Sequence, residues 1–410
     1  MRNIRCILFT SSAIVGFVLQ IVVVLALTSE KVSPFLDQLN STERKMFETW
    51  YLAQIAHKGA LTTYWKRIER LRQHRRNKKK IRQVLTNQDY VINFPPKYNG
   101  PKLNTKLLHN WYAFKRKSEK PRKFHKDNLP DMSDYLRSAK RHYNFVPERI
   151  HEHEYKRRYA IEALSYGLTK DQVVRIFALE TGGNGTADMQ AGVHPVKKTG
   201  RPISSALGYA QLLAANSINV VSKHGHTFVA RLERIIEREH SPKRRMQLQA
   251  KLSSLRAMIR TAKSIPYEWS KQRELARTSQ GMGLHPLNID GLIGPWMQVI
   301  KLADIKRLAE RHGFYNLTGA KLELMNLAGP ITGLEMMKNT GSNKPTANFF
   351  SRHGYYRNAI VHDRTSQQLI AAIDRRMTVN LRKKGSRDFI SIFDKILHHG
   401  DEQIHLQTTN

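Results

Sequence analysis

The sequence predicts a mainly α-helical protein with one large folded domain. Apolar residues recur at helical spacing from about residue 147 to residue 377, and this pattern is typical of helices with one buried face. Glycines at positions 313 and 341 follow two of these stretches, where helices commonly end. Capping boxes that open helices are predicted at Thr169/Gln172, Thr332/Glu335 and Thr365/Gln368. With 410 residues, 40% of them hydrophobic, the chain can bury a sizeable core.

The first 27 residues form an export signal, a membrane anchor, or both. Two arginines, Arg2 and Arg5, precede 21 uncharged residues from Ile7 to Leu27. That length would cross a bilayer and favours a retained anchor, whereas the small residues Val24 and Ala26 favour a cleaved signal peptide. If the segment is retained, the two arginines hold the short N-terminus in the cytoplasm, and everything after Leu27 is exported.

Residues 28–145 are predicted to form a basic stem that is only partly helical. An amphipathic stretch near 44–71 carries several aromatic residues, and residues 66–82 contain ten basic residues against one acidic residue. This run is either a solvated helix face or a patch that contacts an acidic polymer. Pro95 and Pro96, followed by Asn99-Gly100-Pro101, interrupt any regular element and indicate a linker or wrapping segment.

The formal net charge of +36 favours polyanionic partners such as nucleic acid, anionic lipid or acidic wall polymers. Export argues against nucleic acid, because an exported protein does not meet the genome. The single cysteine, Cys6, excludes a disulfide framework and a cysteine-based zinc site. The paired histidines lack the spacing of a metalloprotease helix, so we predict no metal and no cofactor.

Glu180 is the predicted catalytic residue. It ends an apolar helix that begins near Thr169, and Gly182-Gly183 stops the helix directly after it. The helix dipole and the surrounding apolar residues both disfavour an ionised carboxyl at this position, so the pKa of Glu180 is expected to be raised. A carboxyl that stays protonated near neutral pH can donate a proton to the leaving oxygen of a glycosidic bond.

Two sequence runs around Glu180 carry a family resemblance. The first is ALETGGNGTADMQAG, in which Glu180-Thr181 ends a helix, and the second is PISSALGYAQLLAANSI, from Ser205 to Leu213 at its centre. Together they resemble the lysozyme-like superfamily, in particular the soluble lytic transglycosylases and related phage muramidases. The resemblance spans roughly 165–335. It implies a lysozyme-like helical domain that cleaves peptidoglycan glycan strands between N-acetylmuramic acid and N-acetylglucosamine.

The resemblance also implies roles for individual residues. Glu180 would be the catalytic acid, and Thr181, Ser205, Gly208, Tyr209, Gln211 and Asn326 would bind substrate. Gly208 has an expected physical reason as well, since a residue without a Cβ lets the backbone approach a sugar ring closely.

A third family element, Ala-Tyr-Asn-Ala-Gly, has only a partial counterpart in residues 324–329. Asn326 is kept, but Met325 replaces the tyrosine that in the family reaches toward the catalytic acid, and one residue is inserted before the glycine. Tyr209, or one of Tyr355 and Tyr356, is a candidate substitute for that tyrosine.

The reaction type depends on whether a second carboxylate is present. Asp188, eight residues after Glu180 in a glycine-rich loop, is the candidate second carboxylate, although an aspartate in such a loop more often caps it. Transglycosylases resembling this chain use one glutamate and the substrate's own N-acetyl group, so non-hydrolytic cleavage is favoured. Muramidase-type hydrolysis and a non-catalytic, glycan-binding, membrane-anchored scaffold remain the alternatives.

The domain organisation follows from these elements. The lysozyme-like catalytic domain is expected over residues 146–378, with a helical hairpin inserted at 228–265 around Ser241-Pro242, and with a C-terminal tail at 379–410. Trp296, in a turn-rich loop, is either a platform for a sugar ring or a core residue. The expected location is the periplasm, with peptidoglycan as partner and the inner membrane as a second partner if residues 7–27 are retained.

Overall fold

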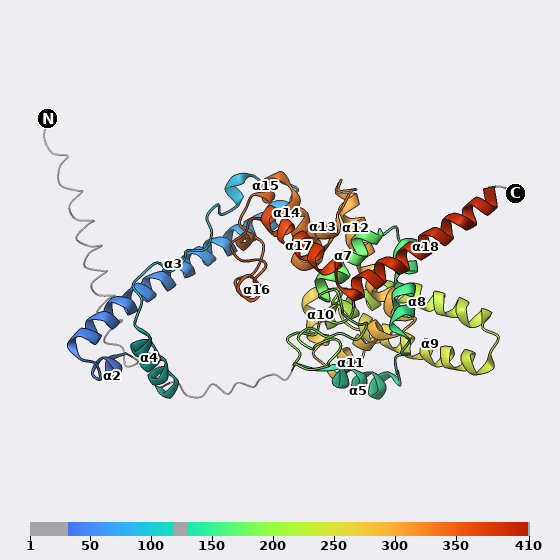
Figure 1. Cartoon of the computed structure of the whole chain (residues 1–410), viewed down its shortest axis with the longest axis horizontal. Helices are drawn as coiled ribbons and strands as arrows, with labels where there is room; N and C mark the ends of the chain where they lie inside the picture. Colours follow the sequence, from blue (N-terminus) through green and yellow to red (C-terminus); the bar gives the residue numbers. More distant parts are fainter. Residues whose placement is uncertain (1–31, 119–128, 409–410) are drawn as a thin grey trace. The chain divides into compact units, whose positions relative to one another are not determined.

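The computed structural model describes residues 32–118 and 129–408, and within these ranges it consists of helices joined by turns and loops (Figure 1). Seventeen α-helices and three short 3-10 helices are present in the described residues, and no strand occurs among them. The predicted mainly α-helical class is therefore confirmed. The chain divides into two compact units, one made of 1–127 with 351–353 and the other made of 128–350 with 354–410.

The first unit is built around one long helix. Its elements are α2 (Ser33–Leu36), α3 (Ser41–Lys80), η1 (Asn87–Asp89) and α4 (Thr105–Ser118). The side chain of Asn40 caps the start of α3 by accepting a hydrogen bond from the Glu43 backbone N–H at 2.9 Å. Where α2, α3 and α4 meet, an aromatic cluster is buried, and it includes Phe35, Phe47, Trp50 and Trp111.

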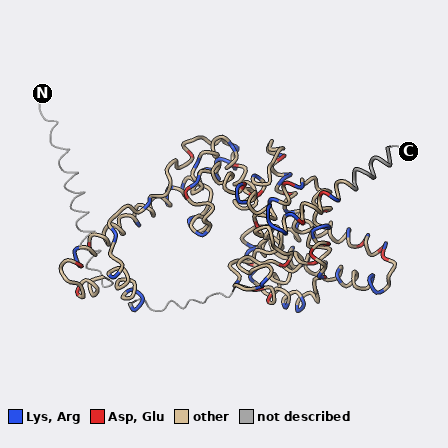
Figure 2. Tube along the Cα trace, in the orientation of Figure 1, with Lys and Arg blue, Asp and Glu red and all other residues tan. Residues whose placement is uncertain are grey.

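The predicted basic run lies in the C-terminal half of α3, and part of it has internal partners. Arg75 is buried, donates to the Asp89 carbonyl at 2.9 Å, and lies over the Tyr90 ring. Lys78 pairs with the Asp89 carboxylate at 2.8 Å. Other basic residues of the run are exposed, and Lys and Arg recur along the whole described chain (Figure 2). Arg75 and Lys78 thus hold the segment around Asp89 against α3. The exposed basic residues of the run form a charged surface on the same helix.

The second unit contains the larger core and the remaining helices, one of which, α16 (Arg352–Arg357), begins with two residues of the first unit. Its elements are α5 (Met132–Tyr143), α6 (Glu152–Ser165), α7 (Lys170–Glu180), α8 (Ala214–Arg238), α9 (Pro242–Lys263), α10 (Trp269–Leu275), α11 (Ser279–Met282), η2 (His285–Ile289), α12 (Ile293–Arg311), α13 (Gly319–Ala328), α14 (Pro330–Met337), α15 (Asn339–Ser342), η3 (Thr346–Asn348), α16 (Arg352–Arg357), α17 (Ser366–Leu381) and α18 (Lys384–Thr408). Helix α12 is buried along most of its length, and it packs against α6, α8, α13 and α14.

Two of the three predicted capping boxes are confirmed. Thr169 with Gln172 caps α7, and Thr365 with Gln368 caps α17. The prediction at Thr332 was wrong, because α14 already begins at Pro330. Proline suits this first helical position since its missing N–H would have no partner there. Gly313 follows the end of α12 as predicted, whereas Gly341 lies within the short helix α15.

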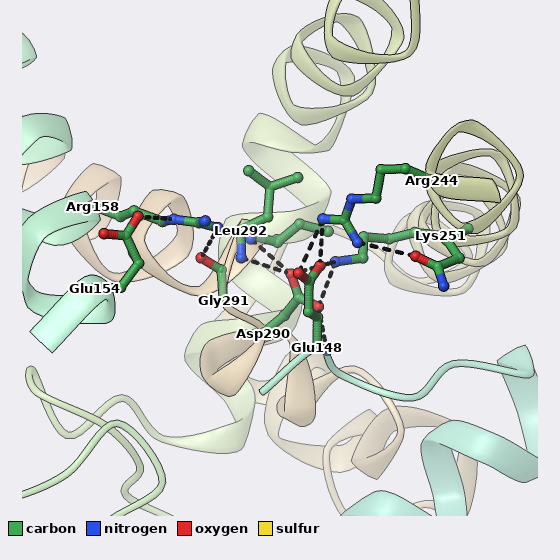
Figure 3. Close-up of polar contacts among 10 residues, drawn as sticks. Glu148, Glu154, Arg158, Arg244, Lys251, Asp290, Gly291 and Leu292 are labelled. Carbon is green, nitrogen blue, oxygen red and sulfur yellow. Dashed lines mark hydrogen bonds and ion pairs between the residues drawn. The ribbon is translucent and has the colours of Figure 1, made fainter. Parts of the chain in front are cut away.

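Helices α8 and α9 form the predicted hairpin, which a buried ion cluster ties to the body of the unit. Ser241 caps α9 and Pro242 is its first residue, as expected from the sequence. Nζ of Lys251 lies 2.8 Å from a carboxylate oxygen of Asp290, which is fully buried, and 3.0 Å from Glu148. Figure 3 shows that Arg244 of the same helix also reaches the Glu148 carboxylate, beside Lys251.

The C-terminal segment contributes to the core of the unit. Residues 379–410 were expected to be a tail, yet α18 places Phe389 and Phe393 in the interior, where Phe389 packs on Phe177 and Tyr209. The expected signal or anchor at residues 1–27 lies outside the described residues. Among the helices that the structure describes, none combines the length and the apolar character needed to span a bilayer.

Candidate active site

Helix α7 carries Glu180 at its last position, and several contacts fix this end of the helix. Its inward residues, among them Val173, Val174 and Phe177, are buried, as the apolar pattern predicts. Asn380 of α17 donates its side-chain N–H to the Ala178 carbonyl at 2.8 Å, which satisfies one of the free carbonyls at the helix end. Gly183 then adopts a positive φ of +78°, where an added Cβ would lie 2.4 Å from the Asn380 carbonyl oxygen.

Glu180 lies in the wall of a cavity of about 860 Å³. The wall also includes residues of the 189–192 and 203–213 segments, of α10, α12 and α17, and of the turn between α13 and α14. Polar groups from Gln211, Asn216 and Asn326 line it beside apolar side chains and the ring of Trp269, which is 45% exposed. This size and this mixture of apolar surface and few polar groups are typical of a ligand site.

The Glu180 carboxyl lies in hydrogen-bonding contact with the carboxyl of Glu323, which is on α13 and only 1% exposed. Burial raises the pKa of Glu180, while its hydrogen bond with Glu323 and the charge of Arg376 partly offset this effect. Burial, followed by the neighbouring Glu180, raises the pKa of Glu323 well above its usual value. The predicted rise in the pKa of Glu180 therefore agrees with the surroundings of this side chain. Those surroundings include a second carboxyl, that of Glu323.

Two cationic side chains share the cavity wall with Glu180. Arg376 projects from α17, and Lys301 projects from α12. Burial lowers the pKa of Lys301, although the nearby Asp304 opposes this shift. An anionic or strongly polar ligand in the cavity would thus lie near two cationic side chains.

Paired backbone segments form a further part of the cavity wall. The Ala191 backbone N–H donates to the Ala206 carbonyl at 3.0 Å, and the Gly208 N–H donates to Met189 at the same distance. Gln211 adopts a positive φ of +44°, and its side-chain amide donates to the carbonyls of Gly208 and Met189. Gln211 therefore lines the cavity and also locks the loop that carries it.

Of the predicted substrate-binding residues, Gln211 and Asn326 line the cavity together with Glu180. Ser205 instead has a structural position, since its hydroxyl accepts a hydrogen bond from the Ala214 N–H at the start of α8. Thr181 is 3% exposed and donates to the Phe177 carbonyl at 2.6 Å. It lines a second, smaller cavity of about 600 Å³ with Glu152 and Lys156, rather than the cavity of Glu180.

Gly208 and Tyr209 also lie outside the lining of the cavity. An added Cβ at Gly208 would lie 2.2 Å from Nε2 of Gln298, so the close approach that requires glycine here is to a buried side chain. The expected approach to a sugar ring is not what the glycine accommodates. Tyr209 is buried among Tyr155, Tyr159 and Phe177, and its hydroxyl donates to Glu152.

The candidate substitutes for the missing family tyrosine lie away from Glu180. Tyr209 points to Glu152, and the hydroxyl of Tyr355 bonds to Asp363. Tyr356 packs against Tyr355 and His362. Met325 is fully buried against Gly333, where an added Cβ would contact its Cα at 2.6 Å. None of these four side chains is in the cavity lining of the described residues.

Asp188, the candidate second carboxylate, is held by cations. Arg149 lies 2.9 Å from one of its oxygens, Lys198 lies 2.8 Å from the other, and Thr186 donates to it at 2.6 Å. Although burial alone would raise the pKa of Asp188, these hydrogen bonds hold it well below its usual value. Asp188 does not line the cavity of Glu180. Asp188 therefore holds its loop in place through these ion pairs and this hydrogen bond.

Trp296 is a core residue. Of its two predicted roles, a platform for a sugar ring and a part of the core, the second is the one observed. Its ring is 5% exposed, packs on Phe228, and lies 4.2 Å below the Arg231 guanidinium. The aromatic side chain that does face the cavity is Trp269.

Glu323, Lys301, Arg376 and Trp269 were missed by sequence reasoning. Glu323 had one usable signal, because it lies three residues before Asn326 and so shares a helix face with it. The others come from helices far from Glu180 in sequence, and only the tertiary packing brings them to the cavity.

No family model, no curated protein and no solved structure matches this chain.

Proposed function

We propose that this protein is an exported wall enzyme of lysozyme-like fold that cleaves peptidoglycan glycan strands between N-acetylmuramic acid and N-acetylglucosamine. The observation that carries the proposal is the position of Glu180, a desolvated carboxyl in the wall of a cavity of about 860 Å³. Gln211 and Asn326, which belong to two further family-like runs, line the same cavity. Three separate runs of the sequence thus meet around one carboxyl.

The chemistry proposed for Glu180 is acid catalysis followed by base catalysis. Protonated Glu180 gives its proton to the glycosidic oxygen as the bond to the anomeric carbon breaks. The substrate's N-acetyl group stabilises the cationic centre that forms. Glu180, now ionised, takes the proton from the sugar's 6-hydroxyl while that oxygen bonds to the anomeric carbon. The product is a 1,6-anhydromuramoyl end, and the enzyme returns to its starting protonation state.

The surroundings of the other carboxyls favour this route over hydrolysis. A retaining or inverting hydrolase needs a second carboxylate at a defined separation across the sugar. Asp188 is neutralised by Arg149 and Lys198 and is not in the cavity lining. Glu323 is buried in hydrogen-bonding contact with Glu180, which is not the position of a carboxylate that faces the acid across a sugar ring.

The proposed partner and location follow from charge and export. Peptidoglycan is the substrate, the periplasm is the compartment, and residues 7–27 would anchor the protein to the inner membrane if they are retained. The exposed basic residues of α3 suit contact with acidic wall polymers.

The proposal is tested with purified sacculi and the full chain. We expect Glu180→Gln to reduce muropeptide release by at least 1,000-fold, in the upper range for loss of an acid–base catalyst, roughly 10²–10⁴. Glu237→Gln, at an exposed position on the hairpin, is the matched control and should release muropeptides at the wild-type rate. Mass spectrometry of the products should find anhydro ends. Reducing ends would instead indicate the muramidase-type hydrolase.

The buried Met325, in place of a tyrosine, favours one second candidate, a glycan-binding scaffold without activity. Zymography on gels that contain peptidoglycan separates the two proposals. A clearing band supports the enzyme, and sedimentation of the protein with sacculi without any clearing supports the scaffold.

A further inference from the structure

Glu323 contacts Glu180, although it donates and accepts no proton in the proposed reaction. We propose that Glu323 is a positioning residue that acts as a neutral carboxylic acid and donates a hydrogen bond to the Glu180 carboxylate. This inference rests on the proposed function. It gives Glu180 the oriented hydrogen-bond donor that Met325 cannot supply.

The packing of α7 against α13 places the two carboxyls together. Glu323 projects from α13 into the interior, where it is 1% exposed, and it contacts Glu180 at the end of α7. Asn326, one turn further along α13, donates to Oε2 of Glu323 at 3.4 Å. Oε1 of Glu323 meets no N–H or hydroxyl donor among the described residues. An acceptor oxygen that is buried beside a second carboxyl is satisfied when the pair carries a proton.

The charged groups around the pair fall on the side of Glu180. Arg376 of α17 acts on Glu180 from the cavity wall, and Lys301 of α12 lies in the same wall. On α18, which also packs against α7, Asp394 pairs with Lys170 at the opposite end of that helix. Glu323 instead contacts the Glu180 carboxyl and the neutral Asn326 amide.

Position decides which carboxyl keeps the proton, because Glu323 is 1% exposed and outside the cavity lining, whereas Glu180 lies in the cavity wall with Arg376. Burial and the neighbouring Glu180 raise the pKa of Glu323 well above its usual value, whereas Arg376 and the hydrogen bond from Glu323 favour the ionised form of Glu180. Two carboxyls in contact cannot both ionise at low cost. Glu323 therefore stays neutral while Glu180, which faces the cavity, gains and loses a proton.

The consequence for the proposed reaction lies in the step after proton donation. Glu180 becomes a carboxylate in a desolvated wall, where an unpaired charge is costly. The O–H of Glu323 stabilises that carboxylate and holds its orientation until Glu180 takes the proton of the 6-hydroxyl. A neutral acid kept as a hydrogen-bond donor by an apolar site is an established way to stabilise charge in enzymes.

The test compares Glu323→Gln with Glu323→Leu in the full chain, using the pH profile of muropeptide release from sacculi. Glutamine keeps a neutral donor, so we expect release within about threefold of wild type and the same profile. Leucine removes the donor, and we expect release to fall about 10- to 100-fold. Its descending limb should also move to higher pH, because the pKa of Glu180 rises when the hydrogen bond that lowers it is lost.

Glu335→Gln on α14, also a buried glutamate but outside the cavity lining, is the matched control and should match wild type in rate and profile. If the leucine variant does not fold, the glutamine variant still decides the matter. A glutamine variant that folds but loses more than tenfold in rate would show that an ionisable group is needed, and it would overturn the proposal. Leucine behaving as wild type would overturn it as well. If wild type itself releases nothing at any pH, the proposed function fails instead.

Discussion

The carboxyl groups of Glu180 and Glu323 contact each other across the packing of α7 on α13, and both are desolvated. A buried carboxyl pair of this kind lowers the stability of the fold at neutral pH, because folding raises the pKa of both groups. A local arrangement that weakens the fold is expected where function requires it. The same contact therefore has consequences for stability that can be measured without any substrate.

Replacing Glu180 by glutamine should stabilise the protein at neutral pH. A carboxyl whose pKa is raised by folding contributes stability at low pH, and that contribution is lost as the pH rises through its folded-state pKa. We therefore expect Glu180→Gln to gain stability relative to wild type between pH 4 and pH 8, by about 1.4 kcal/mol for each unit of pKa shift. Urea unfolding at the two pH values measures this, and Glu237→Gln should show no such change. A difference that shrinks as the pH rises would contradict the expected raised pKa.

Acidification should destabilise the fold through His285. This side chain is fully buried, donates from Nε2 to the Ser205 carbonyl at 2.6 Å, and holds the 204–213 segment in place. Burial lowers its pKa to about 4 from 6.5, so the unfolded chain binds the proton more readily and stability falls as the pH drops from 6.5 toward 4. The loss should reach about 3 kcal/mol.

Thermal unfolding at pH 7 and pH 4 measures this loss, with His285→Gln for comparison. The variant is expected to start less stable, because it loses the packing of the ring on Tyr135. It should nevertheless lose about 3 kcal/mol less than wild type on acidification. Equal acid sensitivity of the two proteins would assign the effect to other groups.

The sequence predicted the parts of the site that depend on local pattern. Thr169 and Gln172 mark the start of α7, and the apolar spacing that follows places Glu180 at its last position, as observed. The hairpin could be predicted for the same reason, since Ser241-Pro242 is a local start signal. These features are encoded within a few residues of each other, so one sequence suffices to find them.

The parts that could not be predicted depend on packing between distant segments. The partner of Glu180 is Glu323, 143 positions later, and periodicity alone does not say which two helix faces meet. The predicted reason for a glycine at position 208, close approach to a sugar ring, was wrong because the group that lies against it is the side chain of Gln298 on α12. Asp188 had two local interpretations, and the ion pairs with Arg149 and Lys198 decided between them. The same limit applied to Trp296, whose burial depends on Phe228 and Arg231.

Removing Lys251 should weaken the attachment of the hairpin. Its ammonium neutralises the fully buried Asp290, and Lys251→Met would leave that carboxylate unpaired inside the protein. Breaking a buried pair in this way typically costs about 3–5 kcal/mol. Arg256→Met on the same helix removes an ion pair with Glu233 whose side chains are 52% and 38% exposed, and it should cost less than about 1 kcal/mol.

Urea unfolding of both hairpin variants at pH 7 measures this contrast. The double change Lys251→Met with Asp290→Asn should recover part of the loss, because no buried charge then remains. However, the Asp290 oxygens also accept hydrogen bonds from the backbone N–H groups of Glu148, Leu292 and Ile293, so recovery should be incomplete. Equal costs for Lys251→Met and Arg256→Met would show that burial of the pair contributes nothing.

Two glycines with similar backbone angles separate conformational strain from crowding. Gly208 and Gly313 have φ values of +79° and +84°, but an added Cβ meets Nε2 of Gln298 at 2.2 Å in the first case and nothing within 4 Å in the second. Gln298 is fully buried and makes three hydrogen bonds, to the Ala210 N–H, the Tyr155 hydroxyl and the Asn288 carbonyl. It therefore cannot move aside without breaking them.

Alanine at Gly313 should cost about 1 kcal/mol, the usual penalty for a side chain at positive φ. Alanine at Gly208 should cost about 1–3 kcal/mol more, because overpacking is added to the same strain. Since the Gly208 carbonyl also accepts from the Gln211 amide, the Gly208 variant should lower muropeptide release under conditions where both variants are folded. Denaturation midpoints measure the difference in stability between the two variants. Muropeptide release from sacculi measures the difference in activity. Similar costs at the two positions would mean that Gln298 yields to the added methyl group, and that the cavity wall is less rigid than its hydrogen bonds indicate.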